Sequence, residues 1–80
     1  MGKSGHYKDE IAINAFGNRV RSLRQSTGKS IEEFANENSL EVTQLSRIER
    51  GEVNCTISYI YRLASIFDMT ASELLDFELE

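Results

Sequence analysis

Side chains of the kinds that catalyse reactions are few in this chain and stand apart from one another. His6 is the single histidine and Cys55 the single cysteine, so an intramolecular disulfide and a zinc site of spaced Cys and His ligands are excluded. The sequence holds neither a glycine-rich phosphate loop nor a nucleophile triad. Glu32, Glu33 and Glu37 are interpreted as the solvated face of a helix. We therefore expect no enzyme, no catalytic residue, no metal ion and no cofactor.

A different chemistry is available in the segment VTQLSRIER, residues 42–50. Leu45 and Ile48 are three residues apart, so both point to one side of a helix. The other side carries Val42, Thr43, Gln44 and Arg47. A helix fits the major groove of DNA, where arginine can pair with guanine, threonine with a base edge or phosphate, and valine with a thymine methyl group.

The net charge of the whole chain argues against binding to nucleic acid, but this charge is distributed unevenly along the sequence. The 80 residues carry a formal charge of −4, and binding to phosphates requires basic side chains. Residues 1–50 nevertheless sum to +1, whereas residues 51–80 sum to −5. The acidity therefore belongs to the last third, which we expect to face away from nucleic acid.

Apolar residues recur at helical spacing almost throughout the chain, which predicts an all-α domain. The first helix carries Ile13, Phe16, Val20 and Leu23 and ends at the breakers of residues 26–28. Glycine at position 17 is expected to weaken that helix by up to about 1 kcal/mol relative to alanine.

Two short helices follow. Ser30 and Glu33 form a capping box, after which Phe34 and Ala35 are predicted to be buried. Residues 36–39 are rich in turn formers, and the next helix runs over 42–50, buries Leu45 and Ile48, and ends at Gly51.

The remaining helices are expected to complete the core. Thr56 is the predicted N-cap of a helix whose apolar stripe contains Ile57, Ile60, Leu63, Ala64 and Phe67. Residues 68–70 break it, and a short fifth helix carries Leu74 and Leu75. The result is a compact five-helix bundle with residues 1–8 as a flexible arm, 9–77 as the domain and 78–80 as an acidic end.

Two short helices joined by a tight turn describe a helix-turn-helix. The chain here resembles the Cro/C1-type (XRE-like) family of phage and bacterial repressors, over roughly residues 15–75. The matching segments are FGNRVRSLR (16–24), GKSIEEFA (28–35), LSRIERG (45–51) and LASIF (63–67). The segments 48–50 and 54–57, with the short length, resemble the controller proteins of restriction-modification systems.

The resemblance implies a lambda repressor-like fold and roles for particular residues. Base contacts are implied for Val42, Thr43 and Arg47, with Gln44 close by. Phosphate contacts are implied for the positions of Ser30, Ile31, Arg50 and Asn54, with added attraction from Arg19, Arg21 and Lys29. It also implies an ion pair between Arg24 and Glu49 that fixes the recognition helix.

Four positions depart from the family pattern. Ile31 replaces a glutamine that bonds to DNA, so apolar packing near the sugar-phosphate edge is expected there instead. Ser39 occupies a turn position where glycine is usual, and a positive φ would be strained. Glu52 and its neighbour Val53 stand where many relatives carry basic residues, which implies weaker phosphate binding.

Surplus apolar side chains near the end of the chain indicate a partner surface. Tyr59, Tyr61, Phe77 and Leu79 exceed what one five-helix core needs, which predicts a symmetric homodimer. Such a dimer would place two recognition helices about 34 Å apart and read an inverted repeat in double-stranded operator DNA. The alternative is a protein-interaction module, antitoxin-like or a co-regulator, that uses this acidic, apolar surface.

The expected location of the protein follows from its composition, and the expectation of no small-molecule ligand follows from its length. No apolar run approaches the roughly 20 residues that span a bilayer, and residues 1–10 lack the apolar core of a signal peptide. We therefore expect a cytoplasmic protein without a membrane partner. A chain of 80 residues leaves no room for a separate ligand-sensing domain, so no small-molecule ligand is expected.

Overall fold

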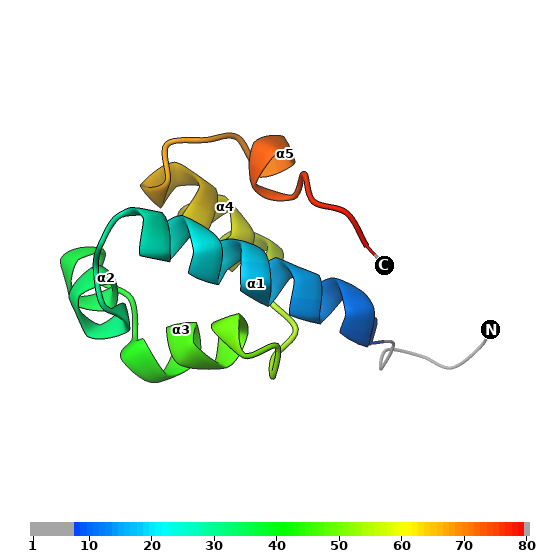
Figure 1. The fold of residues 1–80 in the computed structure, drawn as a ribbon, viewed down its shortest axis with the longest axis horizontal. Helices are drawn as coiled ribbons and strands as arrows, with labels where there is room; N and C mark the ends of the chain where they lie inside the picture. The colour runs from blue at the N-terminus through cyan, green and yellow to red at the C-terminus, as the bar shows by residue number, and fades with distance from the viewer. Residues whose placement is uncertain (1–7, 80) are drawn as a thin grey trace.

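The computed structural model describes residues 8–79 and contains five helices, with no strand among these residues (Figure 1). They are α1 (Glu10–Ser26), α2 (Ile31–Glu37), α3 (Val42–Glu49), α4 (Ile57–Ile66) and α5 (Ala71–Leu74). The predicted all-α class and the number of helices are confirmed. The predicted flexible arm, residues 1–8, lies outside the described residues except for Lys8, as does Glu80 of the acidic end.

The predicted helix caps are confirmed where the sequence carries hydroxyl residues. Ser30 and Glu33 form a complete capping box at the start of α2. The Thr56 hydroxyl accepts a hydrogen bond from the Tyr59 backbone N–H. Asp9 caps α1 in the same way by accepting from Ala12. These caps satisfy backbone donors that a helix start otherwise leaves unpaired, which explains where each helix begins.

The turn of the helix-turn-helix begins later than predicted. Residues 36 and 37 continue α2, because their backbone carries on the helical pattern started at the capping box. Ser39 adopts a φ of +56°, the positive value expected to be strained for a residue with a Cβ. Gly51 follows α3 with a φ of +72°, which confirms the predicted C-terminal glycine.

Gly17 has a packing role that its helix propensity did not indicate. An alanine Cβ at this position would lie 2.4 Å from the carbonyl oxygen of Ile48 and 2.9 Å from that of Glu49. The backbone of α1 therefore lies directly against the C-terminal end of α3. The lower helix propensity of glycine is therefore accompanied by a packing role, because the missing side chain permits this close approach.

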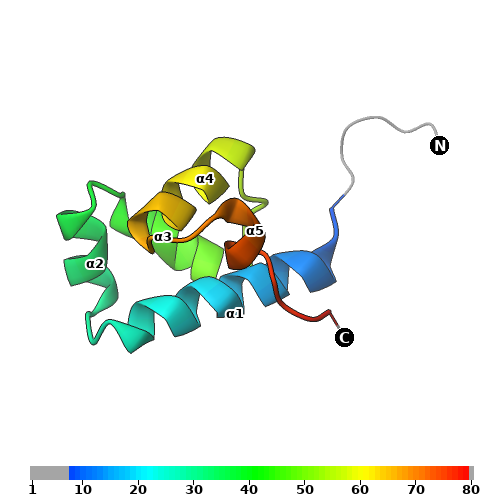
Figure 2. The ribbon, with the colours of Figure 1, turned by 90° about the horizontal axis from the view of Figure 1, so that it is seen from above.

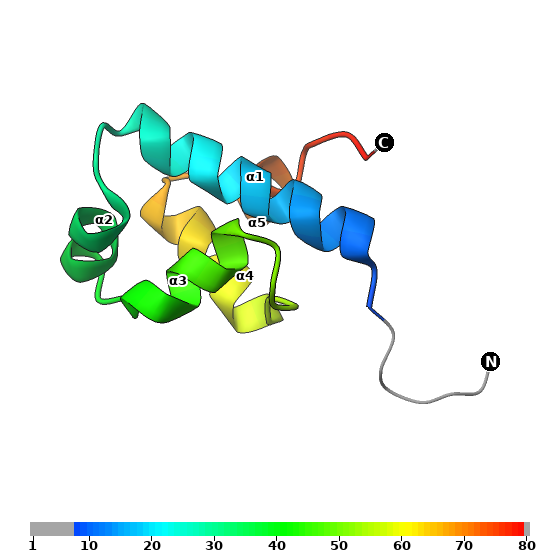
Figure 3. The same cartoon turned by 60° about the horizontal axis from the view of Figure 1, so that its bottom comes forward.

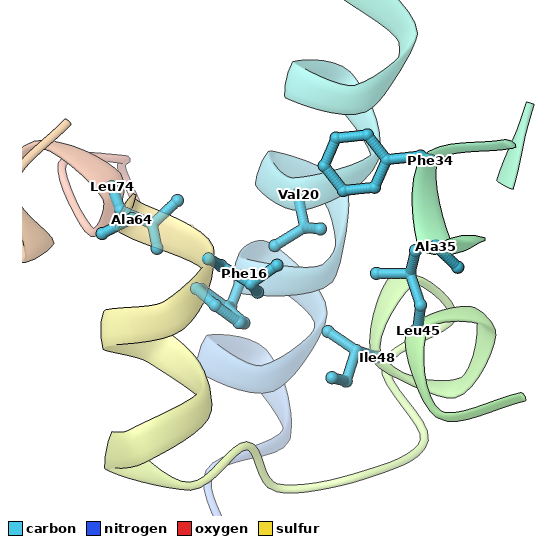
Figure 4. Close-up of a cluster of buried hydrophobic side chains, with 9 residues drawn as sticks. Phe16, Val20, Phe34, Ala35, Leu45, Ile48, Ala64 and Leu74 are labelled. Atoms are coloured by element: carbon cyan, nitrogen blue, oxygen red, sulfur yellow. The ribbon is translucent and has the colours of Figure 1, made fainter. Parts of the chain in front are cut away.

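The core is built from α1 with helices on both sides of it (Figure 4). Phe16 and Val20 point from α1 into the space between α4 and the pair α2 and α3. Phe34 of α2 stacks on Phe67 after α4, with ring centroids 5.2 Å apart. The buried apolar residues are Phe16, Val20, Phe34, Ala35, Leu45, Ile48, Leu63, Ala64 and Leu74.

Two residues predicted to belong to the apolar stripes are exposed instead. Ile57 is 69% exposed and Leu75 is 43% exposed. Ile57 is the first residue of α4 and Leu75 caps the end of α5. Both lie at helix ends, where the helical period no longer dictates which side faces the core.

α5 and the chain after it lie on the far side of the molecule from α3 (Figures 1 and 2). Arg19 of α1 holds α5 in this place, because its guanidinium donates to the carbonyl oxygens of Leu74 at 3.2 Å and Glu73 at 2.8 Å. The acidic residues of α5 and of the chain after it thus lie away from α3, as expected, whereas Glu52, which belongs to the same third, follows α3 directly. None of the helices in residues 8–79 has the length and apolar content needed to cross a bilayer.

Candidate nucleic-acid interface

Turning the bottom of the molecule forward shows α3 below α1 (Figure 3), and α3 presents a polar side to solvent and an apolar side to the core. Leu45 and Ile48 are buried, whereas Thr43 and Arg47 are exposed and lie one helical turn apart. Val42 and Gln44 are half-buried, and Val42 packs partly against the core. The exposed side is therefore narrower than predicted and centres on a threonine and an arginine.

A buried ion pair fixes α3 to α1. Arg24 donates from Nε to Oε2 of Glu49 at 2.7 Å and from Nη2 to Oε1 at 2.9 Å. The Glu49 side chain is only 2% exposed, and this hydrogen bond raises the pKa of Arg24. Arg24 Nη1 also donates to the Lys29 carbonyl oxygen at 2.9 Å, so one guanidinium joins α1, α3 and the segment leading into α2.

Three of the four residues assigned to phosphate contacts surround one cleft. It lies between α1, the start of α2 and the end of α3, has a volume of about 510 Å³, and is lined in part by Ser30, Ile31 and Arg50. Asn54 is exposed in the loop after α3 and is not among the lining residues. Ile31 is half-buried and packs partly against the core, so its side chain offers apolar contact only.

Arg21 also lines this cleft, and the sequence assigned it only a general attraction. Its Nε lies 3.6 Å from Oε1 of Glu49, and its side chain is 44% exposed. Glu49 therefore lies near two arginines of α1 rather than one. The spacing of three residues between Arg21 and Arg24 was the available signal, because residues at this spacing lie on one side of a helix.

Three further cations, Arg19, Lys29 and Arg62, bond to groups within the protein. Arg19 bonds to α5, on the side of the molecule opposite α3, so its attraction to DNA stays a prediction that this placement does not favour. Lys29 pairs with Glu37 at 2.8 Å. Arg62 of α4, which sequence reasoning left without a role, donates to the Asn38 carbonyl oxygen at 2.6 Å and so ties α4 to the turn before α3.

Arg50, the residue after α3, is paired with a neighbouring acid. Its Nε donates to Oε2 of Glu52 at 2.8 Å and its Nη2 to Oε1 at 3.2 Å. This bond raises the pKa of Arg50 and holds the pKa of Glu52 below its ordinary value. The acid expected to weaken phosphate binding thus touches the arginine expected to provide it.

The four residues assigned to a dimer interface differ in how much they offer a partner. Tyr61 is 63% exposed and Leu79 is 53% exposed. Phe77 is half-buried against Phe16, with ring centroids 6.5 Å apart, so part of it completes the core. Tyr59 is half-buried, and its hydroxyl is enclosed without a hydrogen-bond partner among the described residues.

Two short helices at a strained turn, the second buried on one side and polar on the other, define a helix-turn-helix DNA-binding domain. Comparison with known proteins agrees, because residues 15–77 match the sequence model described as "Helix-turn-helix domain". The chain belongs to this family, in its XRE/Cro-like form, and is a DNA-binding domain of transcription regulators.

Individual relatives are regulators as well. The HTH-type transcriptional regulator DdrOP3 of Deinococcus deserti is 34% identical over 58 residues, which are 72% of this chain and 45% of that protein. The chain thus spans under half of the length of this curated relative.

Two solved structures are similar to this chain in both sequence and fold. The restriction-modification controller protein C.AhdI of Aeromonas hydrophila superposes with a TM-score of 0.71 at 34% identity, covering 84% of this chain and 99% of that one. The hypothetical transcription factor NHTF from Neisseria superposes with a TM-score of 0.71 at 30% identity, covering 90% and 84% of the two chains.

Proposed function

We propose that this protein regulates transcription by binding an inverted-repeat operator as a homodimer, with α3 in the major groove. The observation that carries the proposal is the exposed pair Thr43 and Arg47 on a helix whose other side is fixed by Leu45, Ile48 and Glu49. A helix held this firmly can present its side chains to base edges at a defined depth, which direct readout requires.

Base recognition is assigned to one side of α3. Arg47 has the length and the planar donors to pair with guanine, and Thr43 can reach a base edge or a phosphate. Gln44 and Val42 stand beside them with less exposed surface, so they are assigned the shallower contacts. Arg47 therefore has the largest share in choosing the sequence.

Phosphate contacts are assigned to the two ends of the helix-turn-helix. Ser30 and Ile31 begin α2, and Arg50 and Asn54 follow α3. The cleft that Ser30, Ile31 and Arg50 line has room for a phosphate group, and its three arginines outnumber its two glutamates, Glu32 and Glu49. Such contacts set the orientation on the duplex but do not read its sequence. Ile31 can contribute only its backbone N–H and its apolar side chain.

Dimerisation is assigned to the surface of α4 and the chain after α5. Tyr61 of α4 and Leu79 after α5 are exposed, whereas Tyr59 of α4 is half-buried and Phe77 is half-buried against α1. A twofold axis would repeat α3 at about 34 Å, one turn of DNA. The likeness to a restriction-modification controller protein supports this mode of action. A cytoplasmic location, a domain over residues 9–77 and function without a cofactor belong to the same proposal.

The experiment is selection of duplexes from a random pool, followed by binding measurements on the selected sequence and a shuffled duplex across a salt series. Arg47→Ala is expected to cost about 1–3 kcal/mol on the selected duplex and little on the shuffled one. Equal losses on both would remove Arg47 from base reading. Sedimentation of the protein alone and with DNA tests the dimer, and a monomer at every concentration would contradict it.

The same experiment tests the alternative of a protein-interaction module. A steep fall of affinity with salt together with a sequence preference supports regulation by DNA binding. Absence of binding at low salt would favour the interaction module instead. The exposed side chains of Ile57 and Tyr61, one turn apart on α4, would then be the surface to map.

A further inference from the structure

The end of α3 carries an acid in contact with an arginine assigned to DNA phosphate. The guanidinium of Arg50 donates to both carboxylate oxygens of Glu52, at 2.8 and 3.2 Å. Its third nitrogen, Nη1, donates to the Ser46 hydroxyl at 3.0 Å. Each of the three guanidinium nitrogens thus already donates one hydrogen bond within the protein. The two bonds to Glu52 have the bidentate geometry by which arginine also binds phosphate.

Glu52 lies close to the base-reading side of α3 as well. Its backbone N–H donates to the Arg47 carbonyl oxygen at 2.9 Å, which places the residue one turn beyond Arg47 at the helix end. The charge of Arg47 adds to that of Arg50 in favouring the ionised form of Glu52. The negative charge of Glu52 therefore contacts Arg50 and lies within electrostatic reach of Arg47, the two cations that would face DNA.

We propose that Glu52 competes with DNA phosphate for Arg50 and thereby lowers the affinity of this protein for every duplex, whatever its sequence. The proposal rests on the proposed function, since it concerns the same face of α3. Its physical basis is that a carboxylate and a phosphate bind the same N–H donors of a guanidinium, so that only one of them can occupy these donors at a time.

The pair is able to open because it lies at the surface. The Arg50 and Glu52 side chains are 51% and 50% exposed, and exposed ion pairs are weak and are screened by salt. When DNA binds, Arg50 would release Glu52 and donate to a DNA phosphate instead. The released carboxylate would remain near the negatively charged DNA backbone. Both steps reduce affinity, and neither depends on which bases lie in the groove.

A consequence is that specificity is kept while total affinity falls. Because phosphate contacts are common to all duplexes, Glu52 weakens specific and non-specific binding by the same factor. The ratio between the two then depends on α3 alone. Regulation by a protein with few free cations on this face would rely on base contacts more than on the backbone.

The test is the affinity of Glu52→Gln for the selected duplex and for the shuffled duplex, measured by fluorescence anisotropy at low and physiological salt. The expected gain is roughly three- to tenfold on both duplexes, with a larger gain at low salt because salt screens the charges involved. Glutamine keeps the size of the side chain, so an unchanged melting temperature is expected.

Two further variants separate competition from a general change of charge. Arg50→Gln removes the contested guanidinium, so Glu52→Gln in that background should gain clearly less, because only the repulsion between the carboxylate and the DNA backbone is then relieved. Asp76→Asn removes the same charge from an exposed residue after α5, on the side opposite α3, and should leave affinity almost unchanged.

Each outcome decides between the possibilities. Equal gains from Glu52→Gln and Asp76→Asn, or an equal gain with and without Arg50, would overturn competition at this site. A loss of affinity in Glu52→Gln would overturn it too, because Glu52 would then orient Arg50 for phosphate. If neither the unaltered protein nor any variant binds duplex DNA, the proposed function itself fails and this inference with it.

Discussion

Replacing Gly17 by alanine tests the contact between α1 and α3 on which the position of the recognition helix depends. On an exposed helix the change would stabilise, because alanine has a helix propensity about 1 kcal/mol better than glycine. Here the added Cβ would lie 2.4 Å from one carbonyl oxygen of α3 and 2.9 Å from the next. Ordinary carbon–oxygen contacts begin at about 3.3 Å.

The cost of relieving this overlap exceeds the gain in propensity. Carbonyl oxygens of a helix end cannot rotate aside, so the two helices must separate by about 1 Å, which strains a packed core at the upper end of the usual cost of about 1–3 kcal/mol. Subtracting the gain of about 1 kcal/mol leaves a net destabilisation of about 2 kcal/mol. For a domain of this size that corresponds to a fall in melting temperature of roughly 8–16 °C.

The assay is thermal and urea unfolding followed by circular dichroism. Asn18, the next residue and exposed, provides the control, because Asn18→Ala against Asn18→Gly measures propensity alone in the same helix. Gly17→Ala should be less stable than the unaltered protein, whereas Asn18→Ala should be more stable than Asn18→Gly. If Gly17→Ala instead melts higher by the amount that the Asn18 pair shows, the close approach of α1 and α3 is refuted.

Two further predictions concern buried groups. Glu49→Gln leaves Arg24 without its anionic partner and should destabilise the fold by about 3–5 kcal/mol, whereas Glu32→Gln at an exposed position should change the melting temperature little; equal effects would contradict a structural ion pair. Burial raises the pKa of the Cys55 thiol to about 11 from an ordinary value of 9.0. The fold favours the neutral thiol over the thiolate. The contribution of this preference to the free energy of unfolding is complete below about pH 9 and is lost as the pH rises toward 11. Alkylation of Cys55 should accordingly be slower than that of an unfolded control peptide at pH 8 and accelerate up to about pH 11, and a rate equal to the control would disprove the shift.

Local patterns in the sequence predicted most of the secondary structure. Capping residues such as Ser30 and Thr56 act within three or four positions of themselves, so their hydrogen bonds can be anticipated without knowing the fold. The buried residues Leu45 and Ile48 followed from helical spacing. The resemblance to a known family, rather than spacing, supplied the pairing of Arg24 with Glu49 across 25 positions.

The sequence was least informative where the role of a residue depends on whether a distant part of the chain packs against it. Gly17 was judged by its own helix, while its role comes from the end of α3. Arg19 was counted toward DNA, yet it binds carbonyl oxygens 54 and 55 positions away. Ile57 fitted the period of α4 but lies where no neighbouring element covers it.

The sequence by itself determined that the chain is helical, where most helices begin, and that one helix carries a polar side suited to a DNA groove, because these properties depend on neighbours within one or two turns. Only the tertiary structure decided which cations remain available to DNA. Arg19 and Arg47 look alike in the sequence, but Arg19 bonds to the carbonyl oxygens of α5 whereas Arg47 is exposed on α3. Long flexible cations bond to whatever acceptor the fold brings within reach, and that placement depends on how the helices pack.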